Sequence, residues 1–241
     1  MVVVVEENKD YGQIIGNAEA PYLNQLADDG IVLADHHGIT HPSQPNYFAL
    51  FTGHTWVVDN SPVQLTVPNL ADQLEKAGLS FSGWAEDGSA LRHMPWASVT
   101  TTADTAGTLA NFPTSPAGFA ALPTVSFVTP NDQDNMHDGS IARGDAWLRT
   151  HLGAYQQWAE THNSLLVVTF DEGASTPSNH IPTVIAGAGA SHLTVDQPTD
   201  HYTVLRFIED LYGLAPLGNA AGAELPDLHG AATPILDWWN G

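Results

Sequence analysis

Short apolar runs alternate with segments of helical periodicity along almost the whole chain. Apolar runs bounded by turn residues predict buried strands at residues 1–8, 31–35, 79–87, 124–132, 164–173 and 181–187. Helical periodicity and its stop signals predict helices at residues 20–30, 43–53, 67–78, 144–161 and 201–213. Residues 88–122, rich in Ala, Thr, Pro and Gly, predict an irregular excursion over one end of the sheet. We therefore expect an α/β fold, a three-layer sandwich with a mostly parallel sheet and helices on both faces, forming one domain over residues 1–241.

Polar side chains follow three of the predicted strands. They are Glu7 and Asn8 after the first strand, Asp132, Asp134 and His137 after the fourth, and Asp171 and Glu172 at the end of the fifth. In open α/β sheets the ligand crevice lies at the carboxyl ends of the strands, so we expect these residues to converge on one site. For each residue alone, the alternative is that it simply begins a loop or caps a helix.

Ser43 begins a predicted helix between two prolines, in the stretch THPSQPNYFALFTG (residues 40–53). A serine at this position is commonly an N-cap, and that alternative stays open. The start of a helix also presents unpaired N–H groups and the positive end of the helix dipole, which favour an anion. Asn46, one turn further, is placed to donate its amide to the same anion. A serine hydroxyl needs a base or a metal ion to become a nucleophile, and the carboxylates after the strands can hold such an ion.

Charge and composition exclude several classes of protein. The chain has 27 acidic and 6 basic residues and a formal net charge of −21, so nucleic acid is not an expected partner. Stable association with anionic membranes is disfavoured for the same reason. There is no cysteine, which excludes disulfides and cysteine-bound zinc. The initial run MVVVV is too short for a membrane span and lacks a basic leader, so we expect any export signal to have been removed.

Seven stretches of the chain together resemble a known family. They are EENKDYGQIIG, THPSQPNYFALFTG, LRHMPW, NDQDNMHDGSIARGDAWL, VVTFDEG, NHIPTVIAG and HYTVLRFIEDLYGL, in this order. The family is that of the bacterial phosphoesterases that include secreted acid phosphatases and phospholipases C, a branch of the alkaline-phosphatase-like superfamily. The Ser-x-Pro-Asn core at Ser43 is also similar to the Thr-x-Pro-Asn nucleophile motif of nucleotide phosphodiesterases in that superfamily. The resemblance implies an alkaline-phosphatase-like core.

The resemblance also implies roles for individual residues. Glu7, Asn8, Asp171 and Glu172 would bind one divalent metal ion, and Ser43 would be both nucleophile and metal ligand. Because all these ligands are oxygens, Ca²⁺, Mg²⁺ or Mn²⁺ is favoured, with zinc as a further option. Two-metal members have a histidine where this chain has Glu172, which leaves a second metal open.

Histidines are the candidates for holding the phosphate in place of a second cation. His93 and His137 match positions where the family places histidines on the phosphate, and we assign His137 as the acid that protonates the leaving oxygen. His201, which opens a helix, is a further candidate for the phosphate site. The sequence leaves His36, His37, His41 and His180 unassigned.

The expected function is that of a metal-dependent phosphomonoesterase, an acid phosphatase acting on a small phosphate ester through a phosphoserine intermediate. A phosphodiesterase of phospholipase C type would use the same site, and a non-catalytic metal- or anion-binding domain is the alternative from another class. The resemblance implies a secreted, periplasmic or cell-envelope location. Oligomeric state and the physiological ester stay open.

Overall fold

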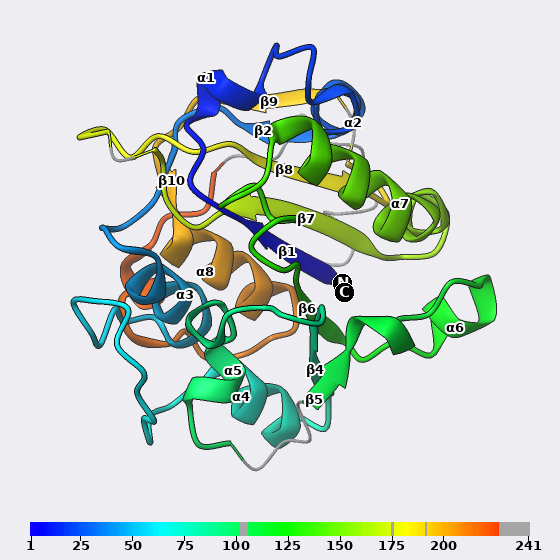
Figure 1. Ribbon diagram of the computed structural model, residues 1–241. Coiled ribbons are helices and arrows are strands. Elements are labelled where there is room, and N and C mark those ends of the chain that lie inside the picture. The colour runs from blue at the N-terminus through cyan, green and yellow to red at the C-terminus, as the bar shows by residue number, and fades with distance from the viewer. Residues whose placement is uncertain (102–105, 175, 191, 227–241) are drawn as a thin grey trace.

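The centre of the protein is an eight-stranded sheet in the order β5-β4-β6-β1-β7-β8-β2-β9 (Figure 1). The computed structural model describes residues 1–101, 106–174, 176–190 and 192–226. The strands of this sheet are β1 (Val2–Glu6), β2 (Ile31–Leu33), β4 (Phe81–Ala85), β5 (Ala106–Thr108), β6 (Val125–Thr129), β7 (Leu165–Phe170), β8 (Thr183–Gly187) and β9 (Leu193–Val195). Only β8 pairs antiparallel with its neighbours, β7 and β2. The prediction of a mostly parallel sheet is confirmed.

Helices cover both faces of the sheet, as expected for a three-layer α/β fold. The α-helices are α1 (Tyr11–Ile14), α2 (Pro21–Asp29), α3 (Ser43–Thr52), α4 (Leu70–Lys76), α5 (Pro95–Ser98), α6 (Pro116–Ala120), α7 (Ile141–Ala159) and α8 (His201–Leu211). Short 3₁₀ turns are η1 (Leu91–His93), η2 (Leu109–Asn111) and η3 (Gly218–Gly222), and β3 (His36–His37) pairs with β10 (Thr199–Asp200) in a separate two-stranded sheet. In Figure 1, α2 and α7 lie on one side of the sheet, and α3, α4 and α8 lie on the other.

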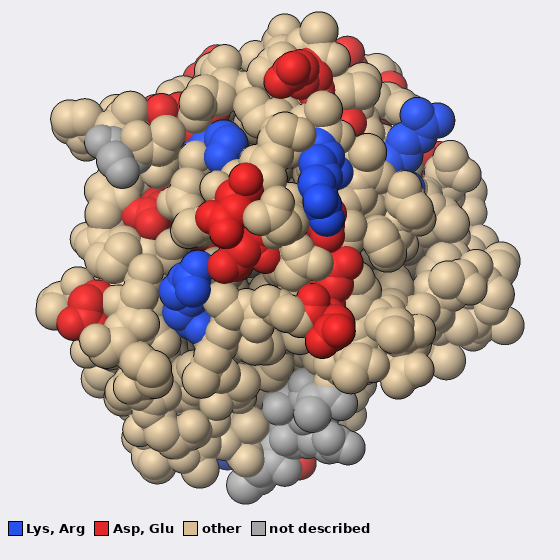
Figure 2. Space-filling view, in the orientation of Figure 1, with Lys and Arg blue, Asp and Glu red and all other residues tan. Residues whose placement is uncertain are grey.

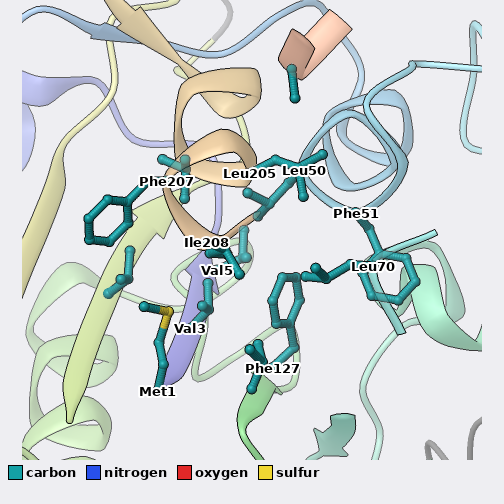
Figure 3. Close-up of a cluster of buried hydrophobic side chains, with 14 of the residues drawn as sticks. Met1, Val3, Val5, Leu50, Phe51, Leu70, Phe127, Leu205, Phe207 and Ile208 are labelled. Carbon is teal, nitrogen blue, oxygen red and sulfur yellow. The ribbon is translucent and has the colours of Figure 1, made fainter. Parts of the chain in front are cut away.

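Strand β1 shows how the sequence builds this core. All five of its residues are buried, because helices cover the sheet on both faces. Val3 and Val5 pack in the cluster that contains α3, α4 and α8 (Figure 3), whereas Val2 and Val4 pack in the cluster under α2 and α7. The run of valines therefore supplies both cores through the two-residue alternation of a strand.

The predicted elements are present with small shifts in their ends. The long helix begins at Ile141 rather than residue 144, because the Ser140 side chain accepts a hydrogen bond from the Arg143 backbone N–H and caps the helix. Residues 88–122 are less irregular than expected, since they contain η1, α5, β5, η2 and α6. The expectation of one domain over 1–241 stays a prediction, because 227–241 lie outside the described residues.

The strand order brings the polar ends of three strands together. β1 lies between β6 and β7, with Glu6 opposite Phe170 and Val4 opposite Val128. The residues that follow β1, β6 and β7 therefore emerge at one edge of the sheet. Within the described residues, no helix has the length and apolar character needed to cross a membrane.

Candidate active site

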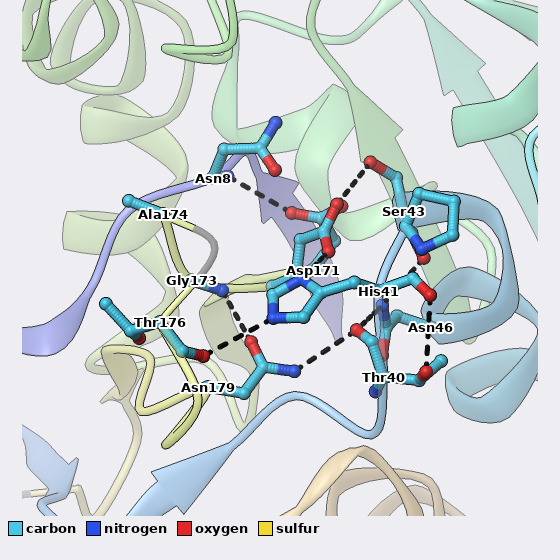
Figure 4. Close-up of polar contacts among 12 residues, drawn as sticks. Asn8, Thr40, His41, Ser43, Asn46, Asp171, Gly173, Ala174, Thr176 and Asn179 are labelled. Carbon is cyan, nitrogen blue, oxygen red and sulfur yellow. Dashed lines mark hydrogen bonds and ion pairs between the residues drawn. The ribbon is translucent and has the colours of Figure 1, made fainter.

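Three buried carboxylates meet at the carboxyl ends of β1 and β7. Glu7 is fully buried, and Asp171 and Glu172 are 1% and 5% exposed. The backbone N–H of Asn8, a residue held at φ 53°, donates to Asp171 Oδ1 over 3.2 Å (Figure 4). The structure thus brings together the four residues that were predicted as metal ligands from the two strand ends.

The charges of these carboxylates are poorly compensated by the protein. Burial, followed by repulsion from Asp171, raises the pKa of Glu7 well above its usual value. Burial and the neighbouring Glu172 raise the pKa of Asp171 to about 7. The second oxygen of Asp171, Oδ2, is buried without a hydrogen-bond partner in the protein. An all-oxygen donor set with an unpartnered buried oxygen suits a hard divalent cation.

Ser43 is the first residue of α3, and its side chain points at these carboxylates. Its Oγ donates to Glu172 Oε1 over 3.0 Å and faces Glu7 Oε2 at 3.3 Å. Pro42 occupies the cap position, and no side chain caps this helix, so the N-cap interpretation of Ser43 is wrong. Pro45 does not disrupt α3, because it lies in the first turn, where backbone N–H groups have no intrahelical partners. The local sequence therefore places a buried hydroxyl between two carboxylates.

Asn46 does not offer a free amide to an anion. Its Nδ2 donates to Thr40 O and Pro42 O, at 2.8 and 3.2 Å, while its Oδ1 accepts from the backbone N–H groups of Ile39 and Thr40. Both amide hydrogens are used within the loop before Ser43. In this structure Asn46 thus shapes the loop that carries Ser43, and its contact with the phosphate stays a prediction.

His93 lies between Glu7, one of the buried carboxylates, and the loop after β6. Its ring is completely buried, stacks on Tyr47 with centroids 5.2 Å apart, and has one nitrogen 3.3 Å from Glu7 Oε1 and the other 3.3 Å from Asp132 Oδ1. Burial, and then the charges of Arg92 and His137, lower its pKa to about 2. Burial thus opposes the expected imidazolium, whereas the carboxylates on both sides of the ring favour it, and the charge of His93 stays a prediction.

His137 and His201 contact different residues of the site. The ring of His137 is exposed, 6.1 Å from the ring of His93, and its Nδ1 is 2.7 Å from Asp138 Oδ1. His201 is buried at the start of α8, where its Nε2 donates to the backbone oxygen of Asp171 over 2.6 Å. The structure therefore places His137 at the rim of the site, whereas His201 contacts the backbone that carries a predicted metal ligand.

Two further residues contact the buried carboxylates and were not predicted from the sequence as site residues. His41 pairs with Glu172 through Nδ1, and the Tyr47 hydroxyl donates to Glu7. His41 lies two residues before Ser43, and Tyr47 lies one helix turn after it. This closeness to Ser43 in the sequence could have indicated both residues.

A group of donors also lies beside His93. Asp132, His137 and Asp138 each bring one ligand atom within 4.8 Å of the others, among the residues that the structure describes. These are the donors that a second cation would use, although Arg92, 3.0 Å from Asp132 Oδ2, offsets part of their charge.

The fold is that of the alkaline-phosphatase-like class of proteins. The fold is similar to that of a Vibrio parahaemolyticus protein of the alkaline phosphatase superfamily, with a TM-score of 0.69 and 14% identity over 93% of this chain and 69% of that one. It is also similar to the phosphonate monoester hydrolase of Agrobacterium radiobacter, with a TM-score of 0.62 and 15% identity over 92% of this chain and 77% of that one.

The chain belongs to the Phosphoesterase family, whose profile matches residues 17–215. It is 43% identical to the phosphatidylinositol-3-phosphatase of Mycobacterium tuberculosis, over 100% of this chain and 82% of that protein. It is 29% identical to the phosphate-repressible acid phosphatase of Penicillium chrysogenum, over 90% of this chain and 60% of that protein. The protein is therefore a hydrolase acting on phosphate esters, which contradicts the alternative of a non-catalytic binding domain.

Proposed function

We propose that the protein is a metal-dependent phosphomonoesterase that acts through a phosphoserine at Ser43. The observation that carries the proposal is the buried Ser43 hydroxyl at the start of α3, within 3.3 Å of both Glu7 and Glu172. A helix start favours the phosphate anion, and the adjacent carboxylates can activate the hydroxyl.

Five residues would hold the metal ion: Glu7, Asn8, Ser43, Asp171 and Glu172. The donor set favours Ca²⁺, Mg²⁺ or Mn²⁺, because every ligand atom would be an oxygen. When bound, such an ion supplies Lewis-acid stabilisation of the serine alkoxide and of the phosphate oxygens.

The residues of this chain then carry out two displacements. Ser43 Oγ attacks phosphorus in line, the bond from phosphorus to the ester oxygen breaks, and the Ser43 proton passes to Glu172, 3.0 Å away. His137 at the rim gives a proton to the leaving oxygen. Water then attacks the phosphoserine and gives a proton to His137, and the bond from phosphorus to Ser43 Oγ breaks. The proton held by Glu172 returns to Oγ, so inorganic phosphate leaves and the Ser43 hydroxyl is restored.

The relatives favour a monoester over a diester substrate. The mycobacterial relative is named for removing a phosphate from phosphatidylinositol 3-phosphate, and the Penicillium relative is an acid phosphatase. A small phosphomonoester, free or as part of a larger molecule, is thus the substrate that we propose, ahead of a phospholipase C-type diester. The proposed location outside the cytoplasm is tested by fractionating cells that express the native gene.

The phosphoserine is tested by quenching the enzyme with acid during turnover of p-nitrophenyl phosphate. Mass spectrometry of the peptide that contains Ser43 should find a phosphate on this residue, and the Ser43→Ala variant is the control. Elemental analysis of the purified protein identifies the metal. Faster hydrolysis of bis-p-nitrophenyl phosphate than of the monoester, or phosphate on a different residue, would contradict the proposal.

A further inference from the structure

Half of the basic residues of this chain bond to one short loop. The chain has six lysines and arginines, and three of them bond to the 131–138 loop, which follows β6 and carries His137. These bonds are Arg92 to Asp132, Arg143 to Asp134, and Lys9 to the backbone oxygen of Met136. In Figure 2 the basic side chains of the visible face lie among acidic ones near its middle. In a chain with 27 acidic residues, such a concentration of positive charge on one loop needs a cause.

Lys9 differs from the two arginines in what it binds. Each arginine faces a carboxylate, as expected for residues that offset the acidic charge of the loop. The ammonium of Lys9 instead donates to a backbone carbonyl, the Met136 oxygen, over 2.7 Å. Lys9 is half-buried, and the negative charges of Glu7, Asp171 and Glu6 attract its ammonium. Charge balance therefore explains why a cation lies here, but it does not explain the hydrogen bond to a neutral carbonyl.

The Met136 oxygen belongs to the peptide group that joins Met136 to His137. The N–H of the same peptide, on His137, donates to Asn135 Oδ1 over 2.9 Å. Both polar atoms of this peptide are thus held, one by Lys9 and the other by Asn135. Met136 has a φ of 72°, a left-handed conformation that is uncommon for a residue with a side chain and costs free energy. The two hydrogen bonds oppose the relaxation of this strained peptide.

The 131–138 loop is bonded twice to the segment that carries two of the predicted metal ligands. Glu7 and Asn8 directly precede Lys9 in the sequence. The Glu7 backbone N–H donates to the Asn135 backbone oxygen over 2.8 Å, and the Lys9 ammonium makes the second bond. These two bonds fix the position of the loop relative to the buried carboxylates. The side chain of Lys9 therefore links the end of β1 to the peptide on which His137 is mounted.

We infer that Lys9 is a positioning residue for the proposed reaction, whose ammonium fixes the peptide before His137 so that the His137 ring meets the oxygen of the leaving group. This inference rests on the proposed phosphomonoesterase function and on the role of His137 as the acid. Lys9 does not bind the substrate and transfers no proton. The proton passes from His137 to the ester oxygen as the bond from phosphorus to that oxygen breaks.

The leaving group decides how much the position of the acid matters. p-Nitrophenolate is a stable anion and leaves without a proton, whereas the alkoxide released from glycerol 2-phosphate needs one. A displaced His137 should therefore slow hydrolysis of glycerol 2-phosphate much more than hydrolysis of p-nitrophenyl phosphate. Loss of the Lys9 charge by itself would weaken both reactions alike, because both substrates bring the same phosphate group to the site.

The test is the ratio of kcat/KM on these two substrates, which does not depend on the fraction of protein that is folded or loaded with metal. Lys9→Met should lower kcat/KM on glycerol 2-phosphate by about 10–100-fold, a part of the roughly 10²–10⁴-fold that a positioned acid contributes, and on p-nitrophenyl phosphate by only a few-fold. His137→Asn should change the ratio in the same direction and by more. Lys9→Met/His137→Asn should resemble His137→Asn, because both substitutions disable the same acid.

Two further variants complete the test. Lys76→Met is the matched control, since it removes the same charge from an exposed position in the last turn of α4 and should leave both rates unchanged. Lys9→Gln, whose side chain is neutral and shorter, should change the ratio as Lys9→Met does, and it replaces that variant if Lys9→Met does not fold.

The remaining outcomes separate this inference from the proposed function. An unchanged ratio in the Lys9 variants, or a further change in ratio when Lys9→Met is added to His137→Asn, would overturn the inference. An unchanged ratio in His137→Asn would exclude His137 as the acid, and the inference with it, while the phosphoserine at Ser43 would still be tested by mass spectrometry. A parent protein that hydrolyses neither substrate would contradict the proposed function itself.

Discussion

Replacing Ser43 with alanine separates the chemical role of its hydroxyl from its structural role. The substitution removes two hydrogen-bond contacts to buried carboxylates, at 3.0 and 3.3 Å, and no capping interaction. Glu172 keeps its pairing with His41, and Glu7 keeps the bond from Tyr47. We therefore expect the free energy of unfolding to fall by about 1–3 kcal/mol, the range for losing a hydrogen bond to a charged group. The loss should lie towards the lower end of this range, because both carboxylates keep another partner.

The expected loss of activity is much larger than this loss of stability. For a protein of 241 residues, the stability loss corresponds to a fall of about 2–12 °C in Tm. Loss of a nucleophile should lower kcat/KM on p-nitrophenyl phosphate by about 10⁴-fold or more. Ser126→Ala is the matched control, since Ser126 is also fully buried but its Oγ has no partner, so activity and Tm should stay near those of the parent. Activity of Ser43→Ala within a few-fold of the parent would refute the nucleophile assignment.

Three further predictions test the metal site, a buried acid and the sheet. Asp171→Asn should lower the bound metal measured by elemental analysis, and full metal occupancy would show that the ion binds elsewhere. The same substitution should raise the Tm of the chelator-treated protein, because it replaces a buried carboxylate beside Glu7 and Glu172, whose second oxygen has no partner, by a neutral amide. Burial raises the pKa of Glu209 to about 7, so the folded state holds its proton more tightly than the unfolded state and stability should fall as pH rises from about 4.5 to 7. Thermal unfolding should show a smaller fall in Glu209→Gln, and an equal fall would count against this assignment. Gly83→Ala should cost about 1–3 kcal/mol in urea unfolding, because its Cβ would lie 2.0 Å from the Trp96 ring, whereas the control Gly12→Ala has open space and should be neutral or stabilising.

The sheet and the convergence of the carboxylates could be predicted because they follow from local patterns. The valine run of β1 and the apolar run of β7 mark buried strands, and the rule that ligands bind at strand ends brings Glu7 to Asp171. The start of α3 at Ser43 follows from the two prolines and the apolar residues after them.

The partners of the site residues could not be predicted, because they depend on side-chain packing between distant segments. Asn46 can reach a phosphate or its own loop from the same backbone position, and the structure shows the loop. The charge of His93 depends on its complete burial beside Tyr47, which no sequence pattern reports. The pairing of His41 with Glu172 joins residues 131 positions apart.

The antiparallel direction of β8 has a consequence for how this protein can diversify. β7 ends at Phe170 and β8 begins at Thr183, so the connection between them leaves and re-enters the sheet at the same edge. A hairpin needs about 2–5 residues for such a connection, and this one has 12, among them Asp171 and Glu172. Asn179, in the same connection, accepts a hydrogen bond from the Gly173 N–H and donates one to the Thr40 backbone oxygen. Insertions in the part of this connection between Gly173 and Asn179 would lengthen it without moving a strand or a carboxylate. Under the proposed function, a change in the length of this connection would alter which esters reach Ser43 and would leave the proposed nucleophile and carboxylates in place.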